Sequence, residues 1–174
     1  MNGSLPGTFG INGANGGPNP MLLEVATDNY YIPDNFFNTF EQFYKNVYTW
    51  SKDDVYGGIP AFGDWSFPYR AVFYSNVVLD GLKILPKTTA NQADYDRIEG
   101  SALFYRAHSF YQLSQVFAPY YEEGRSQNQM GIPLRLKADI SEKSSRSTLE
   151  ETYDQITTDL LKAITLLPIT PLYK

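Results

Sequence analysis

The fold is decided by residues 100–120, which read GSALFYRAHSFYQLSQVFAPY. Positions on one side of this stretch step by four, three, four and three residues, which is the spacing of one face of an α-helix: Leu103, Ala107, Phe110, Ser114 and Phe117. Proline cannot continue a helix, so Pro119 ends the pattern. We predict a helix from Asn91 to Ala118, with Asn91 as its cap and Asp94 near its positive end.

Two further long helices are predicted beside this one. The upstream helix runs from about Asp64, a plausible N-cap, to Leu85, and Pro86 stops it. The downstream helix is the clearest of the chain, because Ser147 and Glu150 have the spacing of a capping box and Pro168 marks the end. Its apolar positions again step by four and three: Leu149, Tyr153, Ile156, Leu160 and Ala163.

The remaining segments are shorter or irregular. Residues 1–20 hold six of the 13 glycines with Asn and Pro between them, which predicts a loop or loosely held arm. A helix is predicted from Thr39, with Gln42 three residues on, to Trp50. A loop follows from Ser51 to Gly63, and the apolar patch from Ile132 to Leu136 predicts an extended segment.

The linker from Lys87 to Gln92 is short enough to force an antiparallel return between two helices. We therefore predict a mainly α fold of tetratricopeptide-like helix pairs with long loops. The 34-residue tetratricopeptide consensus itself does not appear cleanly. We place residues 21–174 in one helical domain that follows the arm.

Composition excludes several classes of function. The chain has 174 residues, no cysteine and a formal net charge of −5, without the clustered Lys and Arg that track a phosphate backbone, so we predict no nucleic-acid partner. No apolar run approaches the roughly 18 residues that span a bilayer, and the first residues do not have the pattern of a signal peptide. Tyr, Phe and Trp make up 16% of the chain, and such rings suit a packed core, a wet interface or a sugar-like ligand.

A catalytic constellation is not evident. The single histidine, His108, lies within the predicted helix without a matched partner, and no G-x-S-x-G elbow, phosphate-binding loop or EF-hand pattern is present. Adjacent acids at 53–54, 122–123 and 150–151 would suit glycoside hydrolysis, but such pairs are common in loops and first helical turns. We expect no enzyme activity, metal or cofactor. Arg106 should be buried, where we expect an ion pair that fixes helix register rather than a ligand contact.

The order of the motifs resembles the SusD/RagB-like family. The "RA..Y..L...FG..P" helix of that family is matched by Arg106, Ala107, Phe110, Leu113 and Phe117, with Ala118 where Gly is usual. Its "Y..i..aN..ld" helix resembles Tyr69, Asn76, Leu79 and Asp80, and its "G.P" segment resembles Gly131–Pro133. Its "R.s..evY..I..DL..A...LP" helix resembles a further set: Arg146, Ser147, Thr148, Glu151, Tyr153, Ile156, Asp159, Leu160, Ala163, Leu167 and Pro168.

The resemblance implies a surface lipoprotein of the outer membrane that captures oligosaccharides or polysaccharides without catalysis. It would pass them to a TonB-dependent SusC-like transporter. Family members are longer, so the resemblance implies that this chain is the N-terminal part of such a fold, with the C-terminal half absent. The signal peptide and the lipid-bearing cysteine that would anchor the protein are not in the sequence.

For ligand binding we select four residues in and beside the loop that follows the Thr39–Trp50 helix: Trp50, Asp53, Tyr56 and Trp65. Aromatic rings pack on sugar faces and carboxylates accept hydrogen bonds from hydroxyls. The two tryptophans could equally be core residues at helix ends. Two other functions stay open: a tetratricopeptide-like scaffold that binds a protein or peptide, and a hydrolase that uses an acidic pair.

Overall fold

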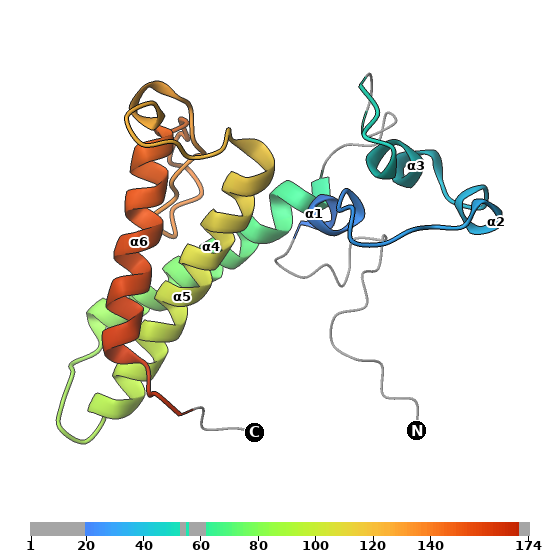
Figure 1. Ribbon diagram of the computed structural model, residues 1–174. Helices are drawn as coiled ribbons and strands as arrows, with labels where there is room; N and C mark the ends of the chain where they lie inside the picture. Colours follow the sequence, from blue (N-terminus) through green and yellow to red (C-terminus); the bar gives the residue numbers. More distant parts are fainter. Residues whose placement is uncertain (1–19, 53–54, 56–61, 171–174) are drawn as a thin grey trace, which may run out of the picture. The chain divides into compact units, whose positions relative to one another are not determined.

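The structure, a computed structural model, describes residues 20–52, 55 and 62–170. The chain divides into two compact units, residues 1–67 and residues 68–174. Both units are built from helices (Figure 1). Within the described ranges, the pairing of Met130 with Thr148 is an isolated antiparallel β-bridge, and no strand longer than this occurs. The mainly α prediction is confirmed.

The second unit contains three long helices, and each runs antiparallel to the long helix before it (Figure 1). They are α4 (Phe62–Ile84, whose first turns precede this unit), α5 (Gln92–Phe117) and α6 (Leu149–Leu166), with the short 3-10 helix η1 (Ser126–Asn128) between the last two. The predicted boundaries hold within two residues at most ends. The fully buried side chains that join the helices are mainly aliphatic: Val72, Ala107, Phe110, Leu113, Ile132, Leu149 and Ala163.

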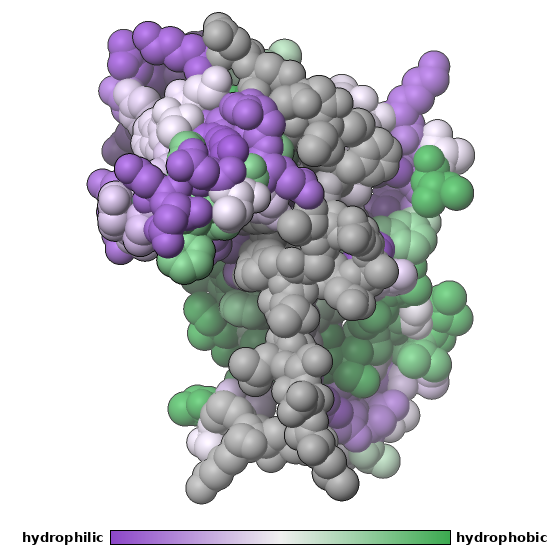
Figure 2. All heavy atoms as spheres, turned by 90° about the vertical axis from the view of Figure 1, so that its right-hand side faces the viewer, coloured by the Kyte–Doolittle hydropathy of each residue, from purple (hydrophilic) through white to green (hydrophobic). Residues whose placement is uncertain are grey.

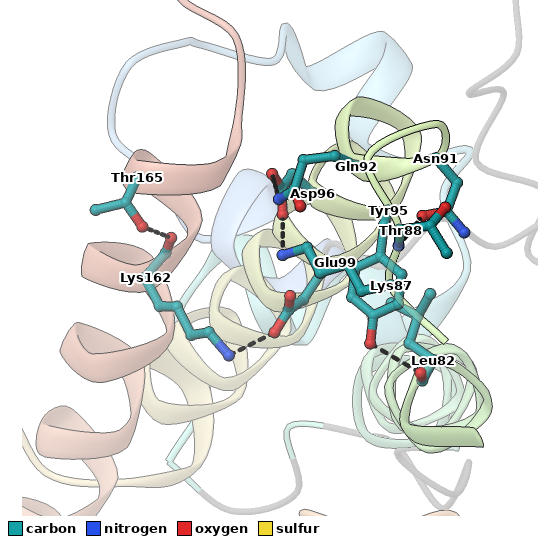
Figure 3. A network of polar contacts seen from close by, with 10 residues as sticks. All are labelled: Leu82, Lys87, Thr88, Asn91, Gln92, Tyr95, Asp96, Glu99, Lys162 and Thr165. Carbon is teal, nitrogen blue, oxygen red and sulfur yellow. Dashed lines mark hydrogen bonds and ion pairs between the residues drawn. The ribbon is translucent and has the colours of Figure 1, made fainter. Parts of the chain in front are cut away.

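The turn between α4 and α5 is fixed by polar contacts (Figure 3). The Lys87 Nζ atom lies 2.5 Å from Asp96 Oδ1, and the Tyr95 hydroxyl donates to the Leu82 carbonyl over 2.8 Å. Asn91 precedes α5, but its side chain does not cap that helix. Its Oδ1 atom accepts the Thr88 backbone N–H instead, so Asn91 stands at the predicted cap position but makes no capping hydrogen bond.

The N-terminus of α6 has a capping box one residue later than predicted. The Thr148 hydroxyl accepts the Glu151 N–H, and the Glu151 carboxylate accepts the Thr148 N–H over 2.8 Å. Ser147 is not the cap, because its hydroxyl donates to the Ile132 carbonyl over 2.7 Å. The prediction of a box from Ser147 and Glu150 is therefore wrong, although the helix itself begins at Leu149 as its sequence pattern indicates.

Residues 129–138, which we call the connecting segment, lie between η1 and α6 in the chain and make contacts with both α6 and α4. At one end Gly131 and Ile132 exchange backbone hydrogen bonds with Ser147. Further along, the Tyr69 hydroxyl of α4 donates to the Pro133 carbonyl over 2.8 Å. Residues 132–136 form no helix or strand, in agreement with the predicted extended segment.

Between residue 20 and the start of α4, the described part of the first unit contains three short helices: α1 (Met21–Val25), α2 (Asp34–Phe37) and α3 (Gln42–Tyr48). The predicted cap at Thr39 is wrong. Its hydroxyl donates to the Phe36 carbonyl at the end of α2, and Glu41 precedes α3. None of the helices in the described part of the chain is both long enough and apolar enough to cross a membrane.

Candidate ligand-binding surface

Trp50 lies where α3 ends, at the first position after the helix cap. The Trp50 N–H donates to the Val47 carbonyl over 3.2 Å, and the Ser51 N–H donates to the Asn46 carbonyl over 2.8 Å. These two bonds are those of a Schellman motif, which satisfies the last carbonyls of a helix. The motif requires a left-handed residue at its centre, and here that residue is Trp50, with φ of 53°.

The left-handed conformation is unusual for a bulky side chain. Glycine normally fills this position, because any Cβ atom crowds the following carbonyl there, at a cost of roughly 1 to 2 kcal/mol. Among the described residues, Trp50 is the one non-glycine residue with positive φ. Strain of this kind persists where the surrounding structure holds it, and it concentrates at functional sites.

The Trp50 ring is both fixed and accessible. Its Nε1 atom donates to the Ala26 carbonyl, at the end of α1, over 2.9 Å. The side chain is nevertheless 72% exposed. The ring is therefore held in one orientation by its polar edge while much of its apolar surface faces solvent, as a stacking surface for a flat ligand requires.

Further aromatic side chains surround the end of α1. The Tyr30 hydroxyl donates to the Val25 carbonyl over 2.8 Å, so Tyr30 and Trp50 bind adjacent carbonyls of the chain. The Tyr30 and Tyr48 ring centroids are 5.8 Å apart, and Tyr48 also accepts the Ile32 N–H over 3.2 Å. The pKa of Tyr30 is raised mainly by burial and, to a smaller extent, by the nearby Tyr48 and Glu24. The Tyr30 hydroxyl therefore stays a neutral donor.

The structure places two of the four selected residues. Trp50 is exposed as described, whereas Trp65 is half-buried in the first turns of α4 rather than in the loop. Asp53 and Tyr56 lie outside the described residues. Whether the four side chains form one site therefore stays a prediction.

Sequence reasoning missed the contribution of α1 to this surface. A carbonyl acceptor such as that of Ala26 has no sequence signal, and it lies 24 residues from Trp50. The adjacent Tyr30 and Tyr31, directly after Asp28 and Asn29, were a usable signal, since they lie outside the predicted helices and tyrosine combines an apolar face with a polar tip. Tyr31 is exposed in the structure.

Arg106, the other polar residue of interest, is buried in the second unit. Its Nε and Nη2 atoms donate to the two carboxylate oxygens of Asp159, each over 2.8 Å, and its Nη1 atom donates to Asn76 Oδ1 over 2.8 Å. Asn76 in turn donates to the Arg135 carbonyl of the connecting segment. The predicted burial of Arg106 and its ion pair with a neighbouring helix are confirmed.

This buried cluster explains the motifs in the sequence. Asn76, Arg106 and Asp159 belong to three separate motifs of the resemblance, on α4, α5 and α6, and they meet at one point. These motifs therefore specify how the helices pack.

His108 is half-buried on α5, with its ring stacked on Phe104 at a centroid distance of 6.2 Å. Its Nε2 atom lies 3.4 Å from Gln112 Nε2. Among the described residues no three His, Asp or Glu side chains are grouped as a metal site would require. We take the exposed aromatic surface at the end of α1 as the candidate for ligand binding.

Comparison with known proteins assigns the chain to a family. A SusD-like family profile described as "Starch-binding associating with outer membrane" matches residues 10–174. A search of curated protein sequences found no match.

Solved structures show the same fold. A sugar binding protein from Bacteroides vulgatus, whose function is given as putative, matches 71% of this chain with a TM-score of 0.60 and 25% identity. A SusD-like carbohydrate binding protein from the same species matches 64% with a TM-score of 0.54 and 25% identity, and a SusD superfamily protein from Bacteroides thetaiotaomicron matches 60% with a TM-score of 0.54 and 24% identity.

The chain spans about a quarter of these solved proteins: the matches cover 27%, 23% and 23% of their lengths. The family profile, in contrast, matches nearly all of this chain. The chain belongs to the SusD-like family, whose description is starch-binding and associating with the outer membrane.

Proposed function

We propose that the protein captures oligosaccharides or polysaccharides at the bacterial outer membrane, and that the surface around Trp50 contacts the sugar. The observation that carries this proposal is the Trp50 ring, which is exposed and held by a hydrogen bond although its backbone is strained. Membership of a family described as starch-binding supports the choice of ligand. The carbohydrate-binding description of a relative from Bacteroides vulgatus supports it further.

The chemistry of the proposed contact is stacking. A sugar ring has one face of C–H groups, which packs on an aromatic face, while its hydroxyls need hydrogen-bond partners at the edge. In the proposal the Trp50 ring provides the face, Asp53 accepts hydrogen bonds from the sugar hydroxyls, and Tyr56 and Trp65 extend the surface. Such open sites bind weakly, with Kd from about 1 μM to 1 mM, which corresponds to roughly −8 to −4 kcal/mol.

Binding without turnover is part of the proposal. Capture alone requires no acid, base or nucleophile, and the bound sugar would be released unchanged. We further propose that the whole protein is held at the cell surface by a lipid anchor. There it would pass its ligand to a TonB-dependent SusC-like transporter.

Affinity electrophoresis in gels that contain soluble starch tests the ligand class, with calorimetry on maltoheptaose as the quantitative step. We expect retarded migration and a Kd in the micromolar to millimolar range. A panel of peptides from digested casein, at the same concentrations, tests the scaffold alternative. Peptide binding without sugar binding would contradict the proposal, as would the appearance of shorter sugars after incubation.

The transfer step has a separate test. The protein should co-purify from detergent-solubilised outer membranes with a TonB-dependent transporter identified by mass spectrometry. If the purified protein still binds starch but no such transporter accompanies it, the proposed transfer step is contradicted and capture alone remains.

A further inference from the structure

The solvent face of α5 is aromatic and uncharged over most of its length. Between Gly100 and Phe117, Arg106 is the one Asp, Glu, Lys or Arg residue of the helix, and it is buried. A helix face in contact with water normally carries charged and polar residues. Here the same face presents the rings of Phe104 and Tyr111, which are 43% and 45% exposed.

The exposed rings of α5 continue onto its neighbours as one surface, which we call the α5 band. On α5 its members are spaced by four, three and four residues, so they share one side of the helix. At the end of this row the Gln115 Nε2 atom donates to the Tyr153 hydroxyl of α6 over 2.8 Å, and the Tyr153 and Tyr121 ring centroids are 4.9 Å apart. The band consists of six side chains: Phe104, His108, Tyr111, Gln115, Tyr153 and Tyr121.

The band has unused hydrogen-bonding capacity. Tyr153 accepts the bond from Gln115, and among the described residues no acceptor is bound to its own O–H. The Gln115 Oε1 atom likewise accepts no hydrogen bond within the described part of the chain. An apolar partner that covered the band would bury these groups unpaired, at a cost of roughly 1 to 3 kcal/mol each. A ligand that carries hydroxyl groups would satisfy both.

The band differs from the purely hydrophobic areas of the chain, which Figure 2 draws in green. Those areas include aliphatic side chains such as Ile84 and Leu85, which are exposed and have no polar group. In the band, an imidazole, an amide or a hydroxyl lies beside each apolar ring. For example, the His108 ring stacks on that of Phe104 with an angle of 24° between their planes.

The shape of the band fits an extended ligand. Phe104 and Gln115 are 11 positions apart in α5, which corresponds to about 16 Å along the helix axis. This length suits several residues of a sugar chain, whose C–H faces pack on rings and whose hydroxyls bind amides and phenols. The absence of charged side chains disfavours an acidic peptide or a phosphate, because such ligands are held by Arg or Lys.

We propose that the α5 band is a second sugar-binding surface, which takes a neutral oligosaccharide or polysaccharide chain along α5. The choice of ligand rests on the proposed function, whereas the position and chemistry of the surface come from the side chains themselves. The band belongs to the second unit and Trp50 to the first, so each surface can be altered without the other. The Phe104 and Tyr111 rings are less exposed than that of Trp50, and the band therefore binds more weakly.

Affinity electrophoresis in gels that contain soluble starch tests the two surfaces separately. The band variant carries Phe104→Ala and Tyr111→Ala, and it is compared with the parent, with Trp50→Gly and with the triple variant. Tyr74→Ala in the Trp50→Gly background is the matched control, because Tyr74 is an exposed tyrosine of α4 outside the band. Thermal unfolding followed by circular dichroism establishes that each variant is folded.

We expect starch to retard Trp50→Gly, although less than the parent, and not to retard the triple variant. The control should migrate like Trp50→Gly itself, and added salt should leave the retardation unchanged, because the band carries no charge. Tyr153→Phe, which keeps the ring, provides a milder change. In the Trp50→Gly background it should weaken starch binding about twofold to tenfold, as the loss of one hydrogen bond implies.

Complete loss of retardation in a folded Trp50→Gly variant would overturn the second surface and leave the proposed function standing. Equal retardation of Trp50→Gly and the triple variant would overturn it as well. A parent that starch does not retard would contradict the proposed function and the second surface together. If the band variant loses all retardation while Trp50→Gly keeps that of the parent, the band is supported and the Trp50 surface is contradicted.

Discussion

Gly131 lies so close to Thr152 that a Cβ atom on the glycine would stand 2.1 Å from the Thr152 Oγ1 atom. The Thr148 carbonyl oxygen would be only 2.5 Å away. This close approach allows the connecting segment to lie against the start of α6, where the Ile132 N–H donates to Thr152 Oγ1 over 3.3 Å. The glycine of the Gly131–Pro133 segment is thus a packing requirement of this chain.

Gly131→Ala should therefore destabilise the chain by about 2 to 3 kcal/mol, because the new methyl group must displace backbone as well as side chain. Urea unfolding measures the change. Gly81→Ala in the 174-residue chain is the matched control, and we expect it to raise stability by up to about 1 kcal/mol. Equal small effects at the two glycines would contradict the observed packing of the connecting segment.

Arg106→Ala should cost about 2 to 4 kcal/mol, since it leaves Asp159 buried without its partner. The Arg106 and Asp159 side chains are only 10% and 3% exposed. The double change of Arg106→Met with Asp159→Leu should cost clearly less than the sum of the two single changes, because it removes both charges together. Arg97→Ala, at a surface ion pair with Asp94, is the control and should stay within about 0.5 kcal/mol of the parent.

The capping box at the start of α6 predicts that two substitutions of Thr148 differ in their effect on stability. Thr148→Ala should lower stability by about 1 kcal/mol, whereas Thr148→Ser keeps the hydroxyl and should change it little. Thermal unfolding followed by circular dichroism distinguishes the two. An alanine variant as stable as the serine variant would show that Thr148 does not cap the helix.

The long helices could be predicted because they carry strong periodicity and end at prolines. Their caps could not be predicted, because each candidate residue has two competing partners. The sequence Ser147–Glu151 contains the capping-box spacing in two registers, and the structure uses the second because the Ser147 hydroxyl bonds to the Ile132 carbonyl. Asn91 fails as a cap for the same reason, since its side chain closes the preceding turn.

The candidate surface was only partly predictable. The loop composition pointed to Trp50, but the sequence pattern does not indicate a left-handed tryptophan, because glycine is the usual signal for that conformation. The hydrogen bond from Trp50 to Ala26 depends on how α1 and α3 pack, which short-range periodicity does not encode. Arg106, in contrast, was predictable, because a guanidinium on a buried helix face requires a buried acceptor.

Asp80 makes stability depend on pH. The pKa of Asp80 lies below the ordinary value of 3.8, mainly because its carboxylate accepts a hydrogen bond from Lys83 and, second, because it accepts one from the Ala138 backbone N–H. A depressed folded pKa adds stability above the unfolded value, and this contribution is lost as pH falls through the folded pKa. Asp80→Asn should therefore lower the melting midpoint at pH 7, and the difference from the parent should shrink as the pH falls below about 3.8. A constant difference from pH 7 to pH 2 would exclude the charge of Asp80 as its cause.

Replacing Trp50 should change ligand binding much more than the stability of the chain. Trp50→Gly removes one hydrogen bond to Ala26, worth roughly 0.5 to 1.5 kcal/mol, but it also relieves left-handed strain of roughly 1 to 2 kcal/mol. The two effects nearly offset each other, so we expect the free energy of unfolding to stay within about 1 kcal/mol of the parent. A loss above about 3 kcal/mol would make Trp50 a structural residue.

The most direct test of the account is calorimetry with maltoheptaose on three proteins: the parent, Trp50→Gly and Tyr120→Ala. Tyr120 is the control because it is about as exposed as Trp50 but belongs to the other unit. We predict that the parent binds, that Trp50→Gly weakens binding by about 1 to 3 kcal/mol while remaining folded, and that Tyr120→Ala binds like the parent. Unchanged affinity in a folded Trp50→Gly variant would contradict the assignment of Trp50 as the sugar-stacking residue.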